Sequence, residues 1–187
     1  LLPGYTASQI ERAKLEHIVR GGACVALTGG HDAGGREQWP LDLDTASRTI
    51  EKYRNRVSAF GVSSMFSVRN PAHEIVLREL IHSLSDRPVT CGHELASSLG
   101  APRRAVTVAF NASLVSYIDR LIRTIQALLS DYGISSPLMV VKGDGSLITA
   151  AVALTRPIET VLSGPAASVV GAAFLAQAEN SIVADMG

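Results

Sequence analysis

Short apolar runs alternate with amphipathic stretches over the first hundred residues of the chain. The apolar runs predict strands at residues 23–28, 57–66 and 88–91, and apolar positions at helical spacing predict helices at residues 7–19, 45–56 and 71–84. Gly21 and Gly22 end the first helix, while Asn70 and Pro71 supply a cap and an initial proline for the third. Because strands alternate with helices, the pattern predicts a mostly parallel α/β sheet.

The pattern changes after Pro102, where a single long amphipathic helix is predicted over residues 105–132, with Gly133 as its C-cap. A buried strand at 138–141, a short helix ending near 154, a helix of small residues from 163 to about 178 and a final strand at 181–185 follow it. We place a domain boundary loosely near residue 100, between a small α/β lobe (1–100) and a second part (101–187).

The end of the chain combines an apolar run with an acid and a glycine. Residues 182–184 (Ile-Val-Ala) are predicted as a buried strand that leads directly into Asp185 and Gly187. Several nucleotide-binding folds begin a phosphate-binding loop in this way, and a carboxylate at such a strand end can hold a magnesium-bound water. We therefore expect the chain to be a middle segment of a larger enzyme, with much of its functional site outside the segment.

Charge and composition exclude some classes of protein. Lys and Arg total 17, as do Asp and Glu, and aromatic residues make up 5%, so neither a basic surface nor a base-stacking platform for nucleic acid is expected. No uninterrupted apolar span of about 20 residues is present, so no membrane is expected. Cys24 and Cys91 fit buried small side chains better than a disulfide framework or zinc site. The default location is the cytoplasm.

Three features of the second part are candidates for chemistry. Residues 142–146 (Lys-Gly-Asp-Gly-Ser) follow a predicted strand and precede a helix, so the glycines would admit an anion and Asp144 would orient a nucleophile or bind a metal. Taken alone, the motif is more typical of a simple turn. Residues 163–168 (Ser-Gly-Pro-Ala-Ala-Ser) begin a helix whose small residues suit either close helix packing or a nucleotide lying between two lobes.

Two alternative hypotheses come from other features. His31 with Asp32, and His93 with Glu94, form two Gly-His-acid steps near strand ends, as in a metal-dependent hydrolase or an acid/base pair. The competing interpretation, which the sequence favours, is that they are turn residues. The apolar stripe of the long helix would alternatively mark a non-catalytic module that docks a partner subunit, although such stripes usually face the protein's own core.

Four motifs in this order resemble one family. They are residues 69–74 (Arg-Asn-Pro-Ala-His-Glu), 142–147, 156–171 and 182–187, of which the block 156–171 is the longest and most specific. From about Gly29 to the end, the chain resembles the hydantoinase A-type (N-methylhydantoinase) chain of the ATP-dependent hydantoinase/oxoprolinase family. The resemblance implies part of an actin-like ATPase (ribonuclease H-like) fold, with a small α/β lobe, a long helix and a truncated ATPase core.

The resemblance also implies an activity and a set of site residues. Such enzymes use ATP and Mg²⁺ to activate the carbonyl of a cyclic amide for ring opening, and relatives activate a ketone for carboxylation. The implied catalytic residues are Lys142 and Asp144, and the implied nucleotide-binding residues are Gly143, Gly145, Ser163, Gly164, Pro165, Asp185 and Gly187, with Asp185 also on the metal. A hydantoinase B-type partner subunit is implied too. Because the first phosphate loop of the family is missing, the segment alone is expected to be inactive.

One departure from the family pattern leaves the substrate open. Many relatives carry Ser-Asn/Asp-Gly-Gly where this chain has residues 143–146 (Gly-Asp-Gly-Ser). Asp144 keeps the acidic or amide position of that motif, but its neighbours differ. A hydantoin, 5-oxoproline or a ketone therefore all remain candidate substrates.

Overall fold

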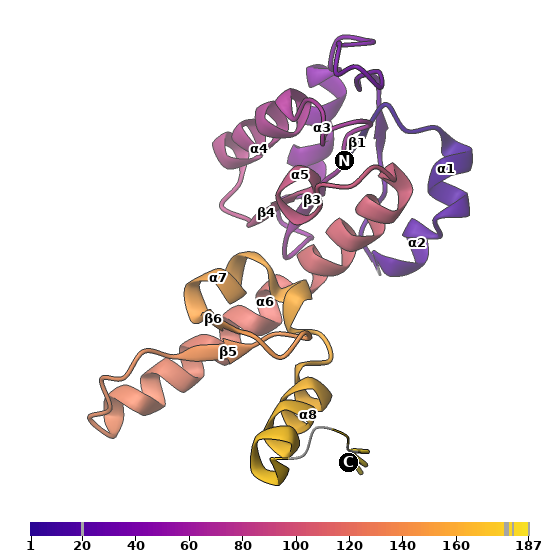
Figure 1. Ribbon diagram of the computed structural model, residues 1–187. Helices are drawn as coiled ribbons and strands as arrows, with labels where there is room; N and C mark the ends of the chain where they lie inside the picture. The colour runs from indigo at the N-terminus through magenta and orange to yellow at the C-terminus, as the bar shows by residue number, and fades with distance from the viewer. Residues whose placement is uncertain (20, 178–179, 181, 187) are drawn as a thin grey trace. The chain divides into compact units, whose positions relative to one another are not determined.

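The computed structural model describes residues 1–19, 21–177, 180 and 182–186, coloured along the chain in Figure 1. They form two compact units, Leu1–Ser116 and Tyr117–Gly187. The long helix α6 (Ala101–Asp131) contributes to both units. The predicted boundary near residue 100 lies ahead of this division, and the assignment of 101–187 to an ATPase core stays a prediction.

Four short parallel strands form the centre of the first unit. β1 (Leu2–Pro3) pairs with β2 (Ala26–Leu27), and β3 (Phe60–Val62) pairs with β4 (Val89–Cys91). Backbone hydrogen bonds from Ser63 to Leu1 and from Met65 to Pro3, both 3.0 Å, connect the two pairs side by side. The strands therefore run in the spatial order β2-β1-β3-β4, and the predicted parallel arrangement is confirmed.

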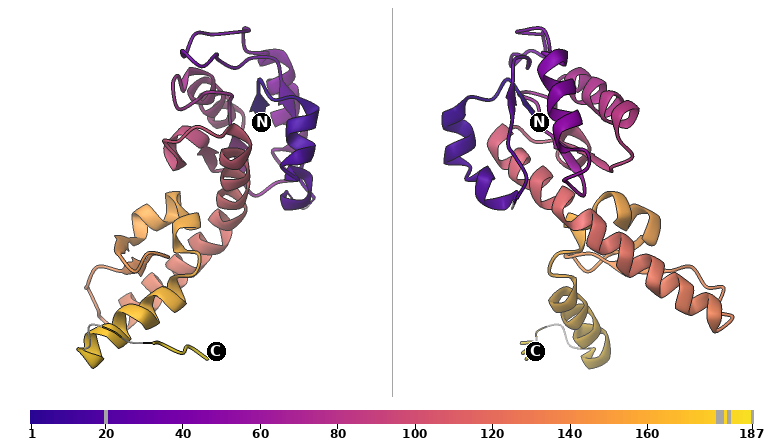
Figure 2. Two further views of the ribbon diagram at one scale, coloured as in Figure 1. Left: turned by 45° about the vertical axis from the view of Figure 1, so that its right-hand side comes forward. Right: turned by 180° about the vertical axis from the view of Figure 1, so that it is seen from behind.

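Helices cover both faces of these strands. α3 (Leu43–Tyr53) and α4 (Ala72–Leu84) lie on one side, and α1 (Ala7–Arg12), α2 (Leu15–Ile18) and the start of α6 lie on the other (Figure 2). The core on the first side consists of Leu27, Ala46, Ile50, Phe60, Val62, Leu77, Ile81 and Cys91. The core on the second side consists of Leu2, Tyr5, Ile10, Leu15, Ala101 and Ala105. Such two-sided cover explains why the strands are short, continuous apolar runs.

The helix predicted over residues 7–19 is divided into α1 and α2. Lys14 lies between them in the left-handed region, at φ 52°, and turns the chain. Because of this turn, Ile10 and Leu15 both reach the same apolar cluster, with Leu15 only 1% exposed. Burial of both side chains therefore outweighs the continuity of the helix.

The second unit is built from a hairpin and short helices around the distal part of α6. β5 (Met139–Val141) and β6 (Leu147–Thr149) pair antiparallel, and α7 (Ala150–Thr155), the 3₁₀ turn η1 (Pro157–Thr160) and α8 (Ser163–Ala176) follow. Its buried apolar cluster is small and consists of Ile122, Ala150 and Ala153. β6 was not predicted: the sequence analysis placed a helix directly after residue 146.

The predicted final strand is wrong for the residues that the structure describes. Residues 182–186 are irregular, and Ile182 is 99% exposed; residue 181 lies outside the described part of the chain. A strand needs a neighbouring strand to pair with its backbone groups. In the described part of the chain no strand pairs with residues 182–186, so their apolar pattern alone does not produce one.

The 31-residue helix α6 is long and apolar enough to cross a membrane, with an 18-residue window of mean hydropathy 1.2. A core helix of a soluble protein meets the same criteria, and a third of this window is buried. The expectation that the protein has no membrane contact stays a prediction.

Candidate functional site

Polar loops gather at the carboxyl edge of the parallel strands in the first unit. Gly29 to His31 follow β2, Ser63 and Ser64 follow β3, and Gly92 and His93 follow β4. The first turn of α4 adds His73 and Glu74 to this edge. In α/β folds with parallel strands, ligands bind outside the carboxyl ends of the strands. The carboxyl edge of the strands is therefore the candidate functional site of the first unit.

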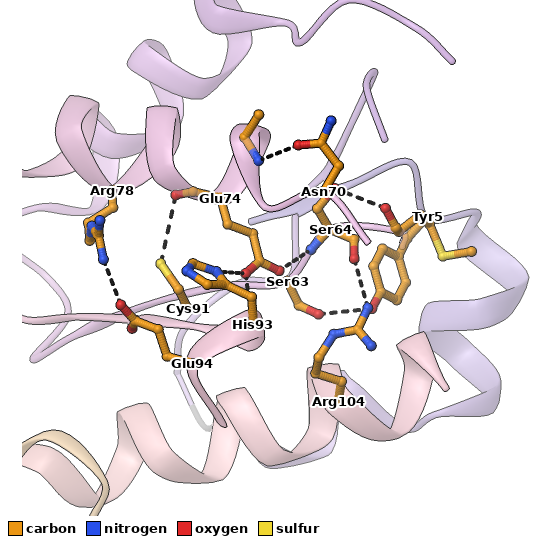
Figure 3. Close-up of polar contacts among 12 residues, drawn as sticks. Tyr5, Ser63, Ser64, Asn70, Glu74, Arg78, Cys91, His93, Glu94 and Arg104 are labelled. Carbon is orange, nitrogen blue, oxygen red and sulfur yellow. Dashed lines mark hydrogen bonds and ion pairs between the residues drawn. The ribbon is translucent and has the colours of Figure 1, made fainter. Parts of the chain in front are cut away.

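Glu74 is a fully buried carboxylate at the centre of this edge (Figure 3). The backbone N–H of Ser64 donates to Oε1 at 2.7 Å, and the backbone N–H of His93 donates to Oε2 at 2.8 Å. Burial by itself would raise the pKa of Glu74, but the hydrogen bonds from the His93 ring, the His93 backbone and Ser64 outweigh it and hold the pKa below its usual range. Glu74 is therefore an ionised group in a pre-formed site.

The ring of His93 completes a carboxylate–imidazole pair with Glu74. Nδ1 of His93 lies 2.6 Å from Oε2 of Glu74, and the His93 side chain is 21% exposed. An ionised carboxylate only accepts hydrogen bonds, so the proton of the pair is carried by Nδ1. A neutral His93 ring consequently presents an unprotonated Nε2.

Cys91 lies in the same cluster, since one ligand-type atom from each of Glu74, Cys91 and His93 lies within 4.8 Å of the others. Its thiol donates to the backbone carbonyl of Glu74 at 3.7 Å, and burial, followed by the charge of Glu74, raises the pKa of Cys91 to about 12. A metal at this cluster would need the thiolate form of Cys91. Here the thiol donates to a carbonyl and both oxygens of Glu74 accept hydrogen bonds, so the three groups are already satisfied by protein partners and Glu74 and His93 form a carboxylate–imidazole pair.

Arg104 supports the loop that holds Glu74. It projects from α6, is 3% exposed, and donates from Nη2 to the carbonyl of Ser64 at 3.0 Å. Gly92 lies between the two charges: a side chain there would come within 3.0 Å of Oε1 of Glu74 and 3.1 Å of Cδ of Arg104. A Cβ atom at this position would therefore require the side chain of Glu74 or Arg104 to shift by a few tenths of an ångström.

A second buried pair, His31 and His73, lies on the β2 side of the edge. The ring centroids are 4.4 Å apart. The backbone N–H of Gly30 donates to Nδ1 of His73 at 2.9 Å, so the neutral ring carries its proton on Nε2, 2.8 Å from Oε1 of Glu37. Burial and then the neighbouring His73 lower the pKa of His31. This arrangement orders the glycine-rich loop and leaves no unprotonated nitrogen on His73 for a metal.

The structure separates the acids of the two predicted Gly-His-acid steps from the histidines beside them. Asp32 accepts the backbone N–H groups of Gly34 (2.8 Å) and Arg36 (3.0 Å) within its own loop, and Glu94 pairs with Arg78 at 2.6 Å. The interpretation of both steps as turn residues therefore holds for Asp32 and is wrong for the second step, because His93 and Glu94 lie in the helix α5 (Gly92–Leu95) and His93 pairs with Glu74.

Sequence reasoning missed the two residues between these steps. His73 and Glu74 belong to the motif at residues 69–74 but were not candidates for chemistry. The sequence feature that could have identified this site is the His73-Glu74 pair, which follows the predicted helix start at Asn70 and Pro71.

In the second unit, Lys142 and Asp144 stabilise the tight turn of the β5–β6 hairpin. Nζ of Lys142 lies 3.1 Å from Oδ2 of Asp144 and 3.3 Å from Oε2 of Glu159. Oδ1 of Asp144 accepts the hydroxyl of Ser146 at 2.6 Å and its backbone N–H at 2.9 Å. These bonds, first from Ser146 and then from Lys142, hold the pKa of Asp144 well below its usual range. The predicted catalytic roles of Lys142 and Asp144 stay predictions.

The predicted nucleotide-binding residues are distributed along the second unit. Gly143 and Gly145 belong to the hairpin turn, where the N–H of Gly143 donates to the carbonyl of Glu159 at 2.8 Å. Ser163, Gly164 and Pro165 open α8, with the latter two exposed. Asp185 is exposed within the irregular residues 182–186, and Gly187 lies outside the described residues. Their roles in binding ATP and Mg²⁺ stay predictions.

Two family models match the chain. The hydantoinase/oxoprolinase model matches residues 104–187, and the hydantoinase/oxoprolinase N-terminal region model matches residues 6–85. The caprolactamase subunit alpha of Pseudomonas jessenii is 32% identical over 158 residues, which cover 82% of this chain and 23% of that protein. The acetophenone carboxylase gamma subunit of Aromatoleum aromaticum is 26% identical over 166 residues, covering 83% of this chain and 22% of that protein.

Solved structures agree with these matches. The crystal structure of the ATP-dependent caprolactamase from Pseudomonas jessenii superimposes with a TM-score of 0.79 and 26% identity, over 94% of this chain and 28% of that chain. The nucleotide-free structure of acetone carboxylase superimposes with a TM-score of 0.69, over 94% of this chain and 29% of that chain; at 15% identity it supports the fold alone.

The chain belongs to the hydantoinase/oxoprolinase family, as its motifs predict. The predicted fold class is confirmed too: the chain is an α/β part of an actin-like ATPase fold. It spans about a quarter of the length of the curated relatives it matches.

Proposed function

We propose that the protein carrying this chain is an ATP-dependent hydrolase that opens cyclic amides of the lactam, hydantoin or 5-oxoproline type. The observation that carries the proposal is the match to both family models together with the 32% identity to a caprolactamase subunit. The caprolactamase of known structure is ATP-dependent. ATP is accordingly the proposed co-substrate, with Mg²⁺ as its metal.

The chemistry explains why ATP is needed. The carbonyl carbon of an unstrained lactam is a poor electrophile, because the amide nitrogen donates electron density to it. Transfer of a phosphoryl group to the carbonyl oxygen, with loss of the amide proton, turns that oxygen into a good leaving group. In this chain Asp185 would supply a carboxylate oxygen, the ligand type that Mg²⁺ prefers, and the opening of α8 at Ser163 would lie near the phosphates.

A ketone carboxylase is the second candidate function. The 26% identity to the acetophenone carboxylase gamma subunit, over 83% of this chain, favours it. Activation of a ketone oxygen by ATP uses the same phosphoryl transfer, but the product gains carbon dioxide instead of water. Incorporation of labelled bicarbonate into an acid-stable product distinguishes the two candidates.

A partner subunit and a cytoplasmic location are part of the proposal. The relatives are named as an alpha and a gamma subunit, which supports a multi-subunit enzyme. The proposed partner is a hydantoinase B-type chain. Co-expression of the two chains followed by size-exclusion chromatography tests their association.

Substrate-stimulated hydrolysis of Mg-ATP by the protein carrying this chain is the decisive measurement. The panel contains caprolactam, hydantoins, 5-oxoproline and simple ketones with bicarbonate, each with the unaltered protein, Asp185→Ala and the exposed control Asp131→Ala. We expect one cyclic amide to stimulate hydrolysis, Asp185→Ala to abolish it and Asp131→Ala to retain it. The 187-residue chain by itself is expected not to turn over ATP. Absence of stimulation by every compound would contradict the proposed function.

A further inference from the structure

In the carboxylate–imidazole pair of Glu74 and His93, the ring nitrogen Nε2 does not contact Glu74 and is free to act on a ligand. Nδ1 of His93 donates to Glu74 at 2.6 Å, and among the described residues no hydrogen bond to Nε2 is recorded. The neutral ring therefore presents an unprotonated Nε2 from a side chain that is 21% exposed. This is the arrangement in which a carboxylate fixes a histidine's tautomer so that its other nitrogen can accept a proton.

The pair is positioned before any substrate arrives. Glu74 accepts two backbone N–H groups besides the His93 ring, so its carboxylate is held against rotation. Both residues lie at the carboxyl edge of parallel strands, where ligands bind in this class of sheet. Cys91 beside the pair donates its thiol proton to the backbone carbonyl of Glu74 and so does not compete with His93 for the carboxylate.

On the basis of the function proposed above, we propose that Nε2 of His93 is the general base that takes a proton from the water attacking the phosphorylated cyclic amide. Glu74 is the positioning residue of this base. The water oxygen forms a bond to the former carbonyl carbon while one of its protons passes to Nε2. The ring carbon–nitrogen bond then breaks and its electron pair stays on nitrogen, which takes up both protons of the water, the first by way of His93. The acyl phosphate that remains is hydrolysed by a second water to a carboxylate and inorganic phosphate.

The charged groups near His93 in the described part of the chain come from several elements. Glu74 faces the ring from α4, and the Glu94–Arg78 ion pair lies beside it between α5 (Gly92–Leu95) and α4. Arg104 of α6 donates to the carbonyl of Ser64 in the loop that holds Glu74, and the amino group of Leu1 acts on Glu74 and Cys91 through its charge.

Replacement of His93 by asparagine separates the two steps of the reaction. An asparagine side chain retains a donor near the position of Nδ1, so the hydrogen bond to Glu74 persists while Nε2 is removed. We expect His93→Asn to lower ring opening about 100-fold or more. In a single turnover, the variant still forms ADP in a substrate-dependent manner, and the phosphorylated amide accumulates. His82→Asn, at an exposed position on α4, is the matched control and retains both steps.

Two results would overturn this role for His93. One is unchanged ring opening in His93→Asn. The other is an equal loss of ADP formation and ring opening, which would mean that His93 serves binding or folding instead of water activation.

Replacement of Glu74 tests its positioning role through the pH profile. In Glu74→Gln the ring is no longer fixed as the Nδ1–H tautomer, so we expect ring opening to fall at all pH values and its dependence on acid pH to shift. Glu79→Gln, at an exposed position on the same helix, should keep the wild-type profile. A fully active Glu74→Gln variant with an unshifted profile would contradict the proposal.

The tautomer of His93 is measurable on the 187-residue chain without any substrate. We expect ¹⁵N shifts at neutral pH to show Nδ1 protonated and Nε2 unprotonated, opposite to the preference of free histidine. A predominant Nε2–H form would overturn the proposal even if Glu74→Gln fails to fold. If the unaltered protein shows no substrate-stimulated turnover, the proposed function fails; if it turns over and His93→Asn is normal, only this inference fails.

Discussion

At the scale of single residues, the most informative side chain is a glutamate in a position where charged groups are rare. Glu74 has no exposed surface, yet hydrogen bonds to its carboxylate outweigh the cost of burial. Two of its donors are backbone N–H groups of loops that follow different strands. The charge therefore connects β3, β4 and α4, and it also sets the tautomer of His93.

Glu74→Gln tests this contribution to stability. The pKa of Glu74 is lowered in the folded protein, whereas an unfolded glutamate titrates near about 4.3. Its stabilisation is thus fully present above that value and is lost as the pH falls through the lower, folded-state pKa. We expect the variant to lose roughly 2–4 kcal/mol of unfolding free energy at pH 7 and less below pH ~4. Urea unfolding at both pH values checks this; a loss that is independent of pH would contradict it.

At the scale of elements, the starts of α3 and α4 and the turn at residues 142–146 were predicted, whereas the strand β6 that follows this turn was not. α4 starts within a residue of the predicted Asn70-Pro71 signal, and α3 starts close to its predicted position, where Asp42 accepts the N–H of Thr45 at 2.9 Å. These signals are local, because a cap bonds a backbone group only a few residues away. Residues 142–146, in contrast, form a hairpin because residues 147–149 pair with β5. That pairing depends on a second strand that the sequence pattern did not reveal.

The close packing of the hairpin turn predicts that a side chain at Gly143 destabilises the second unit. A Cβ atom there would collide with the carbonyl oxygen of Val161, which is backbone and cannot rotate away. We expect Gly143→Ala to destabilise the second unit by about 1–3 kcal/mol. Gly164→Ala, where no atom lies within 4 Å of the added carbon, is the matched control and should be neutral or slightly stabilising. Hydrogen exchange of the β5 and β6 amides reports the difference.

At the turn between α1 and α2, a substitution to glycine is expected to stabilise the protein. Lys14 adopts φ 52°, which costs free energy for a residue with a Cβ atom but not for glycine. We expect Lys14→Gly to stabilise the protein by about 0.5–1 kcal/mol, in contrast to Lys52→Gly inside α3, which should destabilise it by a similar amount. Thermal unfolding of both variants tests this pair; a loss of stability in Lys14→Gly would show that the side chain itself holds the turn.

At the scale of the whole molecule, the two units differ in how much apolar surface they bury. The first unit has an apolar core on each face of its strands, whereas the second has a single cluster of three buried residues. Stability follows buried apolar area. Two large apolar side chains of α8, Phe174 and Leu175, are about four-fifths exposed. The units are therefore expected to open independently.

Hydrogen–deuterium exchange tests this difference in stability. We expect the amides of β3 and β4 to be protected for longest, while β5, β6 and α7 exchange earlier and in a separate step. Ile122→Ala should accelerate exchange in the second unit and leave β3 and β4 unchanged. A single cooperative exchange step for all of these strands would contradict the prediction.

The amino-acid sequence by itself determined the family, the fold class, the alternation of helices with β2, β3 and β4 in the first unit and the presence of the long helix α6, but not the strand β1. These properties depend on local spacing, on capping residues and on motifs that can be recognised along the chain. Tertiary structure decided what the polar residues do, because that depends on which loops meet in space. It placed His93 against Glu74, directed Glu94 to Arg78, and made residues 142–146 a turn between paired strands. A buried charge is stable only beside its donors, and those donors lie far from it along the chain.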